Sequence, residues 1–217
     1  MCFTTKMKSI FCIIILLASG CGYAPLSQDE DAVIPSDYTY IIGPGDSVNI
    51  FVWGNPDIST TATVRPDGKI TIPLAEDLLA SGKTPSQLAR VMEKALSKYV
   101  RDPQVVIMVG GFQGVYSQQV RIIGQLSGGG GGGGGGSAHY SAKSFPYKKD
   151  MTLLDLVIQI GGMGQYADGN RASIIRNIDG EPQHFGIRID DLVDNSDLTA
   201  NIKILPGDII IIPESFF

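Results

Sequence analysis

Three short turns place an aspartate beside glycine and proline, where a carboxylate can do chemistry or hold the backbone. They are Pro44-Gly45-Asp46, Asp67-Gly68 (which follows Pro66) and Pro206-Gly207-Asp208. Two carboxylates flanking a sugar linkage are the machinery of a glycosidase. An aspartate in a Gly/Pro turn, however, usually accepts hydrogen bonds from its own backbone. We therefore expect structural turns at these positions, no catalytic residue and no enzyme activity.

The other residue types that carry chemistry are scattered. His139 and His184 share no HExxH motif and no cysteine partner, so the sequence predicts no metal site and no cofactor. No GxSxG motif is present. Nine consecutive glycines at 128–136 match a phosphate-loop pattern only trivially, because no βαβ unit adjoins them. Trp53 could stack on a sugar ring, although a tryptophan at a strand end is more often core or interface.

The first residues indicate export from the cytoplasm. Lys6 and Lys8 precede an apolar run at 10–18, the length of a signal-peptide core and too short to span a bilayer. Small residues then lead to Gly20 and Cys21, which resembles a lipoprotein cleavage and acylation site. We expect cleavage between Gly20 and Cys21 and a lipid on Cys21. Ordinary secretion with an incidental cysteine is the alternative.

Composition excludes some classes of partner. The net charge is −5, and it would be −7 without Lys6 and Lys8. Lysine and arginine form no basic stripe, so we expect no nucleic-acid binding. Cys2 and Cys12 lie in the expected signal peptide, which leaves Cys21 without an internal disulfide partner. Each domain must therefore be held together by burial.

The patterning predicts an α+β protein of two domains. After a signal peptide at 1–20 and an acylated flexible tether at 21–37, a first domain is expected at 38–110 and a second at 116–213. The first has a strand at 47–53, a hairpin of 61–64 with 69–73, a helix capped by Thr84 with an apolar stripe to Tyr99, and a strand at 105–109.

The second domain alternates strands with one clear helix. Thr152 is a predicted N-cap with Asp155 at the third helical position, and Gly161-Gly162 ends the helix. Its apolar face is predicted to include Leu153, Leu154, Val157 and Ile158. A glycine-rich loop is expected at 128–141 and a short acidic turn at 190–193. The expected strands are 118–124, one near 143–147, 172–177, 183–189 and 208–212.

Several separate blocks resemble one family in the right order. The stretch at 41–73 (IIGPGDSVNIFVWGNPDISTTATVRPDGKITIP) resembles the N-terminal domain of outer-membrane polysaccharide export proteins. The segments VRIIG, SFPYKKDMTLLDLVIQIGG and LPGD resemble a soluble-ligand-binding β-grasp (SLBB) module, which commonly follows that domain. The nine glycines depart from the module, in which a short hairpin joins the first two strands. The chain thus resembles the short, lipid-anchored type of this family.

The resemblance implies a function. Subunits would pack into a homo-oligomeric ring that encloses a passage for an exopolysaccharide or capsular polysaccharide. The expected location is the periplasmic face of the outer membrane. Long members carry a further amphipathic pore helix that is not found here, so we expect a separate outer-membrane barrel as a partner, together with an inner-membrane, tyrosine-kinase-like co-polymerase. The alternative is a monomeric periplasmic lipoprotein that binds a small sugar through its β-grasp domain.

Overall fold

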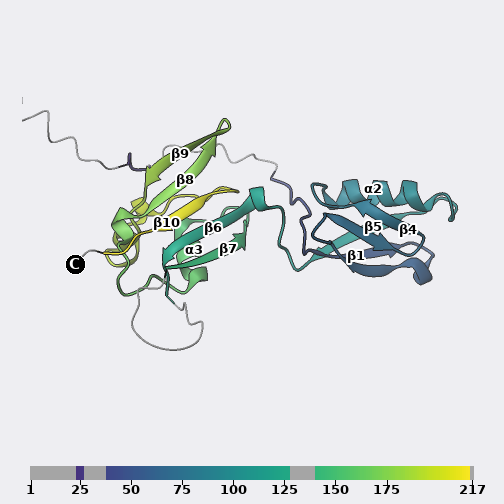
Figure 1. The fold of residues 1–217 in the computed structure, drawn as a ribbon, viewed down its shortest axis with the longest axis horizontal. Coiled ribbons are helices and arrows are strands. Elements are labelled where there is room, and N and C mark those ends of the chain that lie inside the picture. Colours follow the sequence, from purple (N-terminus) through teal and green to yellow (C-terminus); the bar gives the residue numbers. More distant parts are fainter. Residues whose placement is uncertain (1–22, 27–37, 128–139, 216–217) are drawn as a thin grey trace, which may run out of the picture.

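The computed structural model describes residues 23–26, 38–127 and 140–215. Within them, buried apolar side chains form two separate cores, one built from 42–105 and one from 120–212. Figure 1 shows the two parts end to end, joined by an extended connector near residues 111–118. The predicted signal peptide, Cys21 and most of the predicted glycine-rich loop lie outside the described residues. The α+β class is confirmed.

The first domain is built on a three-stranded antiparallel sheet in which β1 is central. Strand β1 (Ser47–Val52) pairs with β2 (Thr60–Thr63) on one side and with β5 (Val105–Gly110) on the other. A turn of 3-10 helix, Pro56–Ile58, separates β1 from β2. Strands β3 (Lys69–Ile72) and β4 (Ala75–Leu79) form a separate antiparallel pair.

Helix α2 (Pro85–Leu96) covers the buried face of this domain. Its predicted N-terminus is observed, because Thr84 and Gln87 exchange hydrogen bonds in a capping box and proline occupies the first turn. Leu88, Met92 and Leu96 are fully buried against the sheet residues. The helix begins where the sequence predicts and ends at Leu96, so the prediction that Tyr99 belongs to the buried stripe is wrong. Tyr99 is exposed.

The predicted hairpin of 61–64 with 69–73 is also wrong, although its turn is present. The amide of Arg65 donates to the carbonyl of Lys69, and Gly68 has a φ of 77°. Beyond this turn the two strands enter different sheets, and β3 pairs instead with β4, which the sequence did not reveal. Asp77 interrupts β4 with a φ of 52°, and the register shifts there, so its apolar alternation is lost.

The second domain has a five-stranded mixed sheet. Strands β6 and β10 are parallel neighbours at its centre, and each outer pair is an antiparallel hairpin. The order β7-β6-β10-β8-β9 is the arrangement of a β-grasp fold. The strands are β6 (Gln119–Gln125), β7 (Tyr140–Pro146), β8 (Ser173–Ile178), β9 (Glu181–Gly186) and β10 (Ile209–Ile212).

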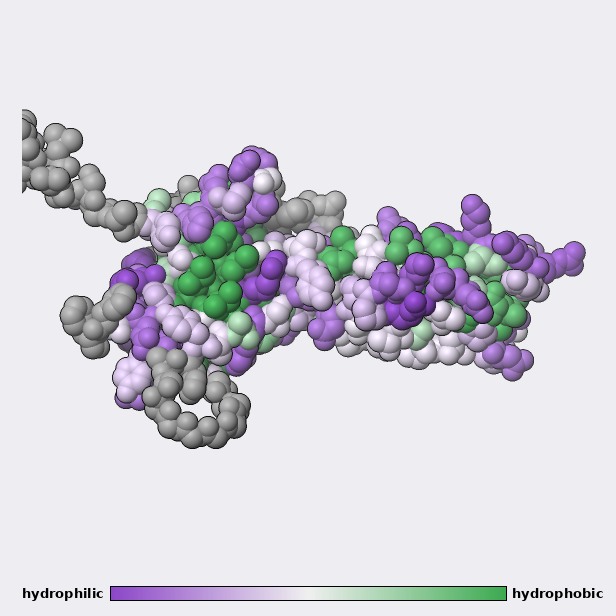
Figure 2. All heavy atoms as spheres, in the orientation of Figure 1, coloured by the Kyte–Doolittle hydropathy of each residue, from purple (hydrophilic) through white to green (hydrophobic). Residues whose placement is uncertain are grey.

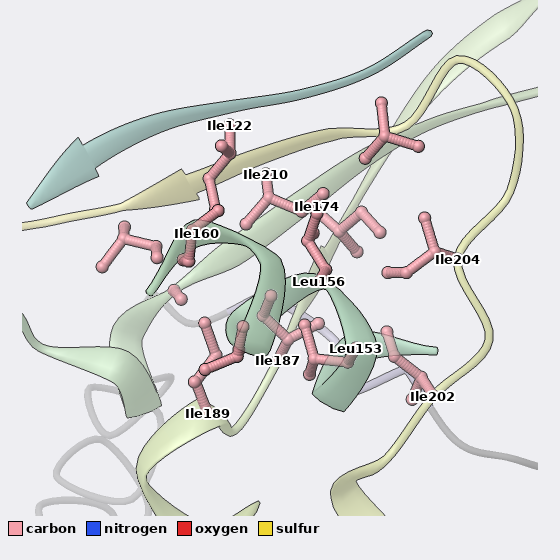
Figure 3. Close-up of a cluster of buried hydrophobic side chains, with 14 of the residues drawn as sticks. Ile122, Leu153, Leu156, Ile160, Ile174, Ile187, Ile189, Ile202, Ile204 and Ile210 are labelled. Carbon is pink, nitrogen blue, oxygen red and sulfur yellow. The ribbon is translucent and has the colours of Figure 1, made fainter. Parts of the chain in front are cut away.

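Helix α3 (Leu153–Ile160) crosses one face of this sheet (Figure 3). Thr152 is the predicted N-cap, and it exchanges hydrogen bonds with Asp155 in a capping box; Gly161 ends the helix with a φ of 84°. Leu156 and Ile160 point toward the isoleucines of the sheet, and Leu153 lies in the same buried core near Ile187 and Ile202. Ile158, which we predicted on the apolar face, is 69% exposed. Leu156 and Ile160 take its place because they follow Leu153 at helical spacing.

The rest of the domain is short connecting structure. The predicted acidic turn at 190–193 is part of helix α4 (Ile189–Val193), which buries Ile189 and Leu192. Turns of 3-10 helix occur at Tyr116–Gln118, Gly169–Arg171 and Leu198–Ala200. Tyr140 and Ser141, which we predicted in the glycine-rich loop, belong to β7.

The described N-terminal residues lie along the edge strand β9. The amide of Leu26 donates to the carbonyl of Gly186, and the amide of Gly186 donates to the carbonyl of Ala24. The ring of Tyr23 stacks on His184 with 5.2 Å between centroids. These contacts occupy backbone groups that an edge strand would otherwise leave open. The chain thus passes the second domain before it enters the first.

Candidate functional site

The first predicted turn, Pro44-Gly45-Asp46, holds a fully buried carboxylate. Gly45 has a φ of 90°, which favours a residue without Cβ. Asp46 Oδ2 accepts hydrogen bonds from the amide of Gly43 at 2.8 Å and from the hydroxyl of Tyr40 at 2.6 Å. Burial raises the pKa of Tyr40, and its bond to Asp46 raises it further. The phenol therefore stays protonated and serves as a donor.

The same carboxylate also holds the connector between the domains. Asp46 Oδ1 accepts hydrogen bonds from the amides of Gln113 at 2.6 Å and Gly114 at 3.1 Å. A further bond crosses the junction from the amide of Ile41 to Oε1 of Gln118. One aspartate thus joins the first turn of the first domain to the segment that leads into the second. This geometry favours a structural role for Asp46.

The turn Pro206-Gly207-Asp208 repeats this device in the second domain. Gly207 has a φ of 91°, and Asp208 accepts from the amide of Leu205, three residues before it, at 2.7 Å. Arg176 donates to both oxygens of Asp208, at 3.0 and 2.8 Å, and also to the carbonyl of Lys203. Burial raises the pKa of the Asp208 carboxyl, and the Arg176 guanidinium opposes this increase.

The third turn is on the surface. Asp67 accepts from the amide of Lys69 at 3.2 Å and pairs with Arg65 at 2.7 Å. Arg65 also pairs with Asp77. Such exposed pairs add little stability, so this network mainly orders the turn.

The arrangement of these acids does not suit acid–base catalysis. The oxygens of Asp46 and Asp208 are occupied by donors and shielded from water, and the two residues belong to different domains. Among the described residues, no group of three His, Cys, Asp or Glu side chains could hold a metal ion. The chemistry available at these turns is backbone organisation.

Trp53, predicted as a glycan contact or a packed residue, lies in the open. It follows β1 directly and is 72% exposed, with its ring edge-to-face against Phe51 at 6.2 Å between centroids. The usual expectation of a core tryptophan does not hold at this strand end. An exposed indole leaves a flat apolar face available to a ligand.

Two sheet faces carry exposed apolar side chains. In the first domain these are Phe51 on β1 and, on the neighbouring β5, Val106 and Met108. In the second domain α3 covers one face of the sheet, and the opposite face bears isoleucines. Figure 2 shows an apolar patch over β10 and the neighbouring β8. We call it the isoleucine face; it consists of Ile123, Ile175, Ile209 and Ile211.

A cavity at the domain junction was not anticipated from the sequence. It measures about 550 Å³ and is lined by residues from the start of the first domain, the connector, the end of β7 and α3. Tyr38 and Tyr40, two residues apart, could have suggested one aromatic surface. Their distant partners carried no sequence signal. The lining residues are Tyr38, Tyr40, Phe112, Pro146, Tyr147, Lys148 and Gln159.

None of the helices within 23–26, 38–127 and 140–215 combines the length and the apolar character needed to cross a membrane.

The first domain is similar to a known protein family. Residues 34–110 match the family model described as polysaccharide biosynthesis/export protein. A curated protein of Ralstonia solanacearum, the EPS I polysaccharide export outer membrane protein EpsA, is 25% identical to this chain over 135 residues. The match covers 51% of this chain and 35% of that relative, so the chain spans about a third of its length.

Proposed function

We propose that this protein is a subunit of a polysaccharide export machine, because residues 34–110 match the family model described as polysaccharide biosynthesis/export protein. In this proposal Cys21 anchors the protein by lipid to the periplasmic face of the outer membrane. Subunits form a ring around a passage for an exopolysaccharide or capsular polysaccharide. A co-polymerase of the inner membrane and an outer-membrane barrel complete the route.

The isoleucine face is the observation that best supports assembly. Ile211 lies beside Ile123 and Ile209 beside Ile175 in the register of the sheet, so the four side chains are neighbours. A contiguous apolar patch on the surface of a soluble domain commonly marks an interface. A closed ring requires each subunit to present two different surfaces. The exposed apolar side chains of the first domain, including Phe51 and Met108, offer a second one.

The β-grasp arrangement of the second domain is consistent with an SLBB module, which would supply these subunit contacts. Trp53 would contact the passing glycan through its exposed ring. The relative named above is an outer membrane export protein, which supports the proposed location. The competing function is a monomeric lipoprotein that binds a small sugar.

Native mass spectrometry of the acylated protein in mild detergent tests the ring. We expect several copies per particle in the wild type and monomers when Ile209→Lys and Ile211→Lys are combined. Val193→Lys is the matched control, because it adds a charge at an exposed apolar side chain on α4. It should leave the assembly unchanged. A monomeric wild type would overturn the ring and favour the competing function.

Lipid anchoring is tested separately. Cys21→Ser should abolish incorporation of a labelled acyl chain and release the protein from the outer-membrane fraction. Equal labelling of the variant and the wild type would contradict the anchor without bearing on the ring.

A further inference from the structure

The junction cavity has the size and composition of a ligand site. Its volume of about 550 Å³ lies within the range of small-molecule pockets, roughly 300–1,000 Å³. Both domains and the connector contribute to it, and domain junctions are frequent places for such sites. Most of its lining is aromatic.

The aromatic rings form two edge-to-face pairs. Tyr38 packs against Tyr147 with 4.9 Å between centroids, and Tyr40 packs against Phe112 at 5.4 Å. Tyr147 is almost fully buried, whereas Phe112 is 53% exposed. Tyrosine combines an apolar ring with a polar tip, and a sugar ring likewise combines C–H faces with hydroxyl edges. The two chemistries are complementary.

One hydroxyl proton in this lining lacks an acceptor. The Tyr147 hydroxyl is buried, and its oxygen interacts with the backbone amide of Asp150, but it donates no hydrogen bond to the described residues. A buried donor without an acceptor costs free energy unless a ligand supplies one. Burial raises the pKa of Tyr38 and Tyr147, so both phenols remain neutral donors near neutral pH. Neutral hydroxyl donors suit the hydroxyl and carboxylate oxygens of a sugar.

The charge at the cavity is positive and would favour an acidic sugar over a neutral one. Lys148 is the only charged residue of the lining within the part of the chain that the structure describes, and the exposed Gln159 also belongs to the lining. Both residues also line an adjoining hollow of about 430 Å³ that contains Lys149, Asp150 and Asp155. The Asp155 carboxylate accepts hydrogen bonds there from the hydroxyl and amide of Thr152, which lower its pKa, and the nearby charge of Lys148 lowers this pKa slightly further.

We propose that the junction cavity binds an acidic sugar residue of the exported polymer, with the aromatic rings against its C–H face, the Tyr147 hydroxyl bonded to the sugar and Lys148 paired with its carboxylate. This inference rests on the proposed export function and names its substrate class. The site also requires both domains, so it depends on the connector held by Asp46.

Titration of the purified acylated full-length protein with tetragalacturonate, monitored by ligand-observed NMR, tests the site. Maltotetraose is the neutral control of equal length. We expect binding of the acidic probe that weakens as salt rises, and much weaker binding of the neutral one. Lys148→Gln should weaken binding of the acidic probe about tenfold through loss of the charged pair. Lys98→Gln, in an exposed position after α2, should have no effect.

Tyr147→Phe separates binding from folding. It removes a buried hydroxyl whose proton has no acceptor among the described residues, so it should leave the melting temperature nearly unchanged and still weaken binding of the acidic probe. If the variant melts at a lower temperature and binds as the wild type does, the hydroxyl serves the fold and the assigned contact is wrong.

The remaining outcomes each decide one point. Equal binding of the two probes would overturn the acidic class. Loss of binding in Trp53→Ala, but not in Lys148→Gln, would move the site to the surface of β1. If the wild-type protein is oligomeric but does not bind tetragalacturonate, the proposed cavity site is wrong and the proposed export function stands. If the wild-type protein is monomeric but binds tetragalacturonate, the cavity site stands and the proposed ring is wrong.

Discussion

The carboxylate of Asp46, in the first domain, accepts a hydrogen bond of 3.1 Å from the backbone amide of Gly114, in the connector. The next amide back, that of Gln113, bonds to the same oxygen at 2.6 Å. The connector is therefore fixed to the first domain by a side chain 67 and 68 residues earlier in the sequence. This network of hydrogen bonds fixes the connector that leads from the family-matched domain into the second domain.

Removal of this carboxylate should loosen the junction. Asp46→Ala leaves the buried amides of Gly43 and Gly114 without partners, at about 1–3 kcal/mol for each unsatisfied group. We expect a clear fall in the urea midpoint of the first domain and faster hydrogen exchange at residues 113 and 114. Asp46→Asn should be milder, because its amide oxygen still accepts.

The matched control is Asp67→Ala, which removes an exposed turn carboxylate. If Asp46→Asn abolished polysaccharide export while the urea midpoint stayed unchanged, a catalytic role for this carboxylate would replace the structural one.

Two glycines should be indispensable for steric reasons. A Cβ at Gly43 would collide with the carbonyl oxygen of Gly114, and one at Gly124 would collide with the carbonyl oxygen of Ile212 across the parallel β6–β10 pair. Gly43→Ala and Gly124→Ala should each destabilise their own domain by about 3 kcal/mol or more, as measured by chemical denaturation. Gly110→Ala, where a Cβ has open space, should be tolerated. Wild-type stability in Gly124→Ala would contradict the observed strand pairing.

The buried ion pair of Arg176 and Asp208 gives a third prediction. Arg176→Met leaves an uncompensated buried carboxylate and should cost roughly 3–5 kcal/mol in the unfolding of the second domain. The double variant Arg176→Met with Asp208→Leu should recover part of this loss, because replacing both charges removes the uncompensated one. Arg65→Met breaks exposed pairs only and should cost less than about 1 kcal/mol. Equal costs for the two single variants would show that burial does not strengthen the Arg176 pair.

Local signals predicted much of the fold. Helices α2 and α3 begin at Thr84 and Thr152, as predicted, because capping boxes are encoded within four residues. The alternation of β1 and the continuous apolar run of β10 also located those strands. Strand β4 and the separation of β2 from β3 were missed, because a bulge hides the alternation and strand pairing depends on distant partners.

The residues of the candidate site also fall into two groups: those with a local sequence signal and those that only the folded chain brings together. The aspartate turns were found because Pro, Gly and Asp are adjacent in sequence, but their partners Arg176, Gln113 and Gly114 carry no local signal. The junction cavity depends on Tyr38 meeting Tyr147, a contact between residues 109 positions apart that only the folded chain creates.

The capping box of α3 should make the stability of the second domain depend on pH. Hydrogen bonds from the hydroxyl and amide of Thr152 lower the pKa of Asp155 below its ordinary value of 3.8. A carboxyl with a lowered folded-state pKa contributes stability above its unfolded pKa and loses that contribution as pH falls through the folded value. Thr152→Ala should therefore cost about 1 kcal/mol at pH 7 and progressively less below pH 3.8. NMR titration of the Asp155 side chain should show its pKa rising in this variant.

Thr84→Ala on α2 is the control for this dependence. Its capping partner is Gln87, which does not titrate, so the cost should be similar in size and constant across the same pH range. The two variants differ in the partner at the third helical position, where one box has a carboxylate and the other an amide. If the costs of Thr152→Ala and Thr84→Ala changed equally with pH, the effect would come from acid unfolding in general and not from Asp155.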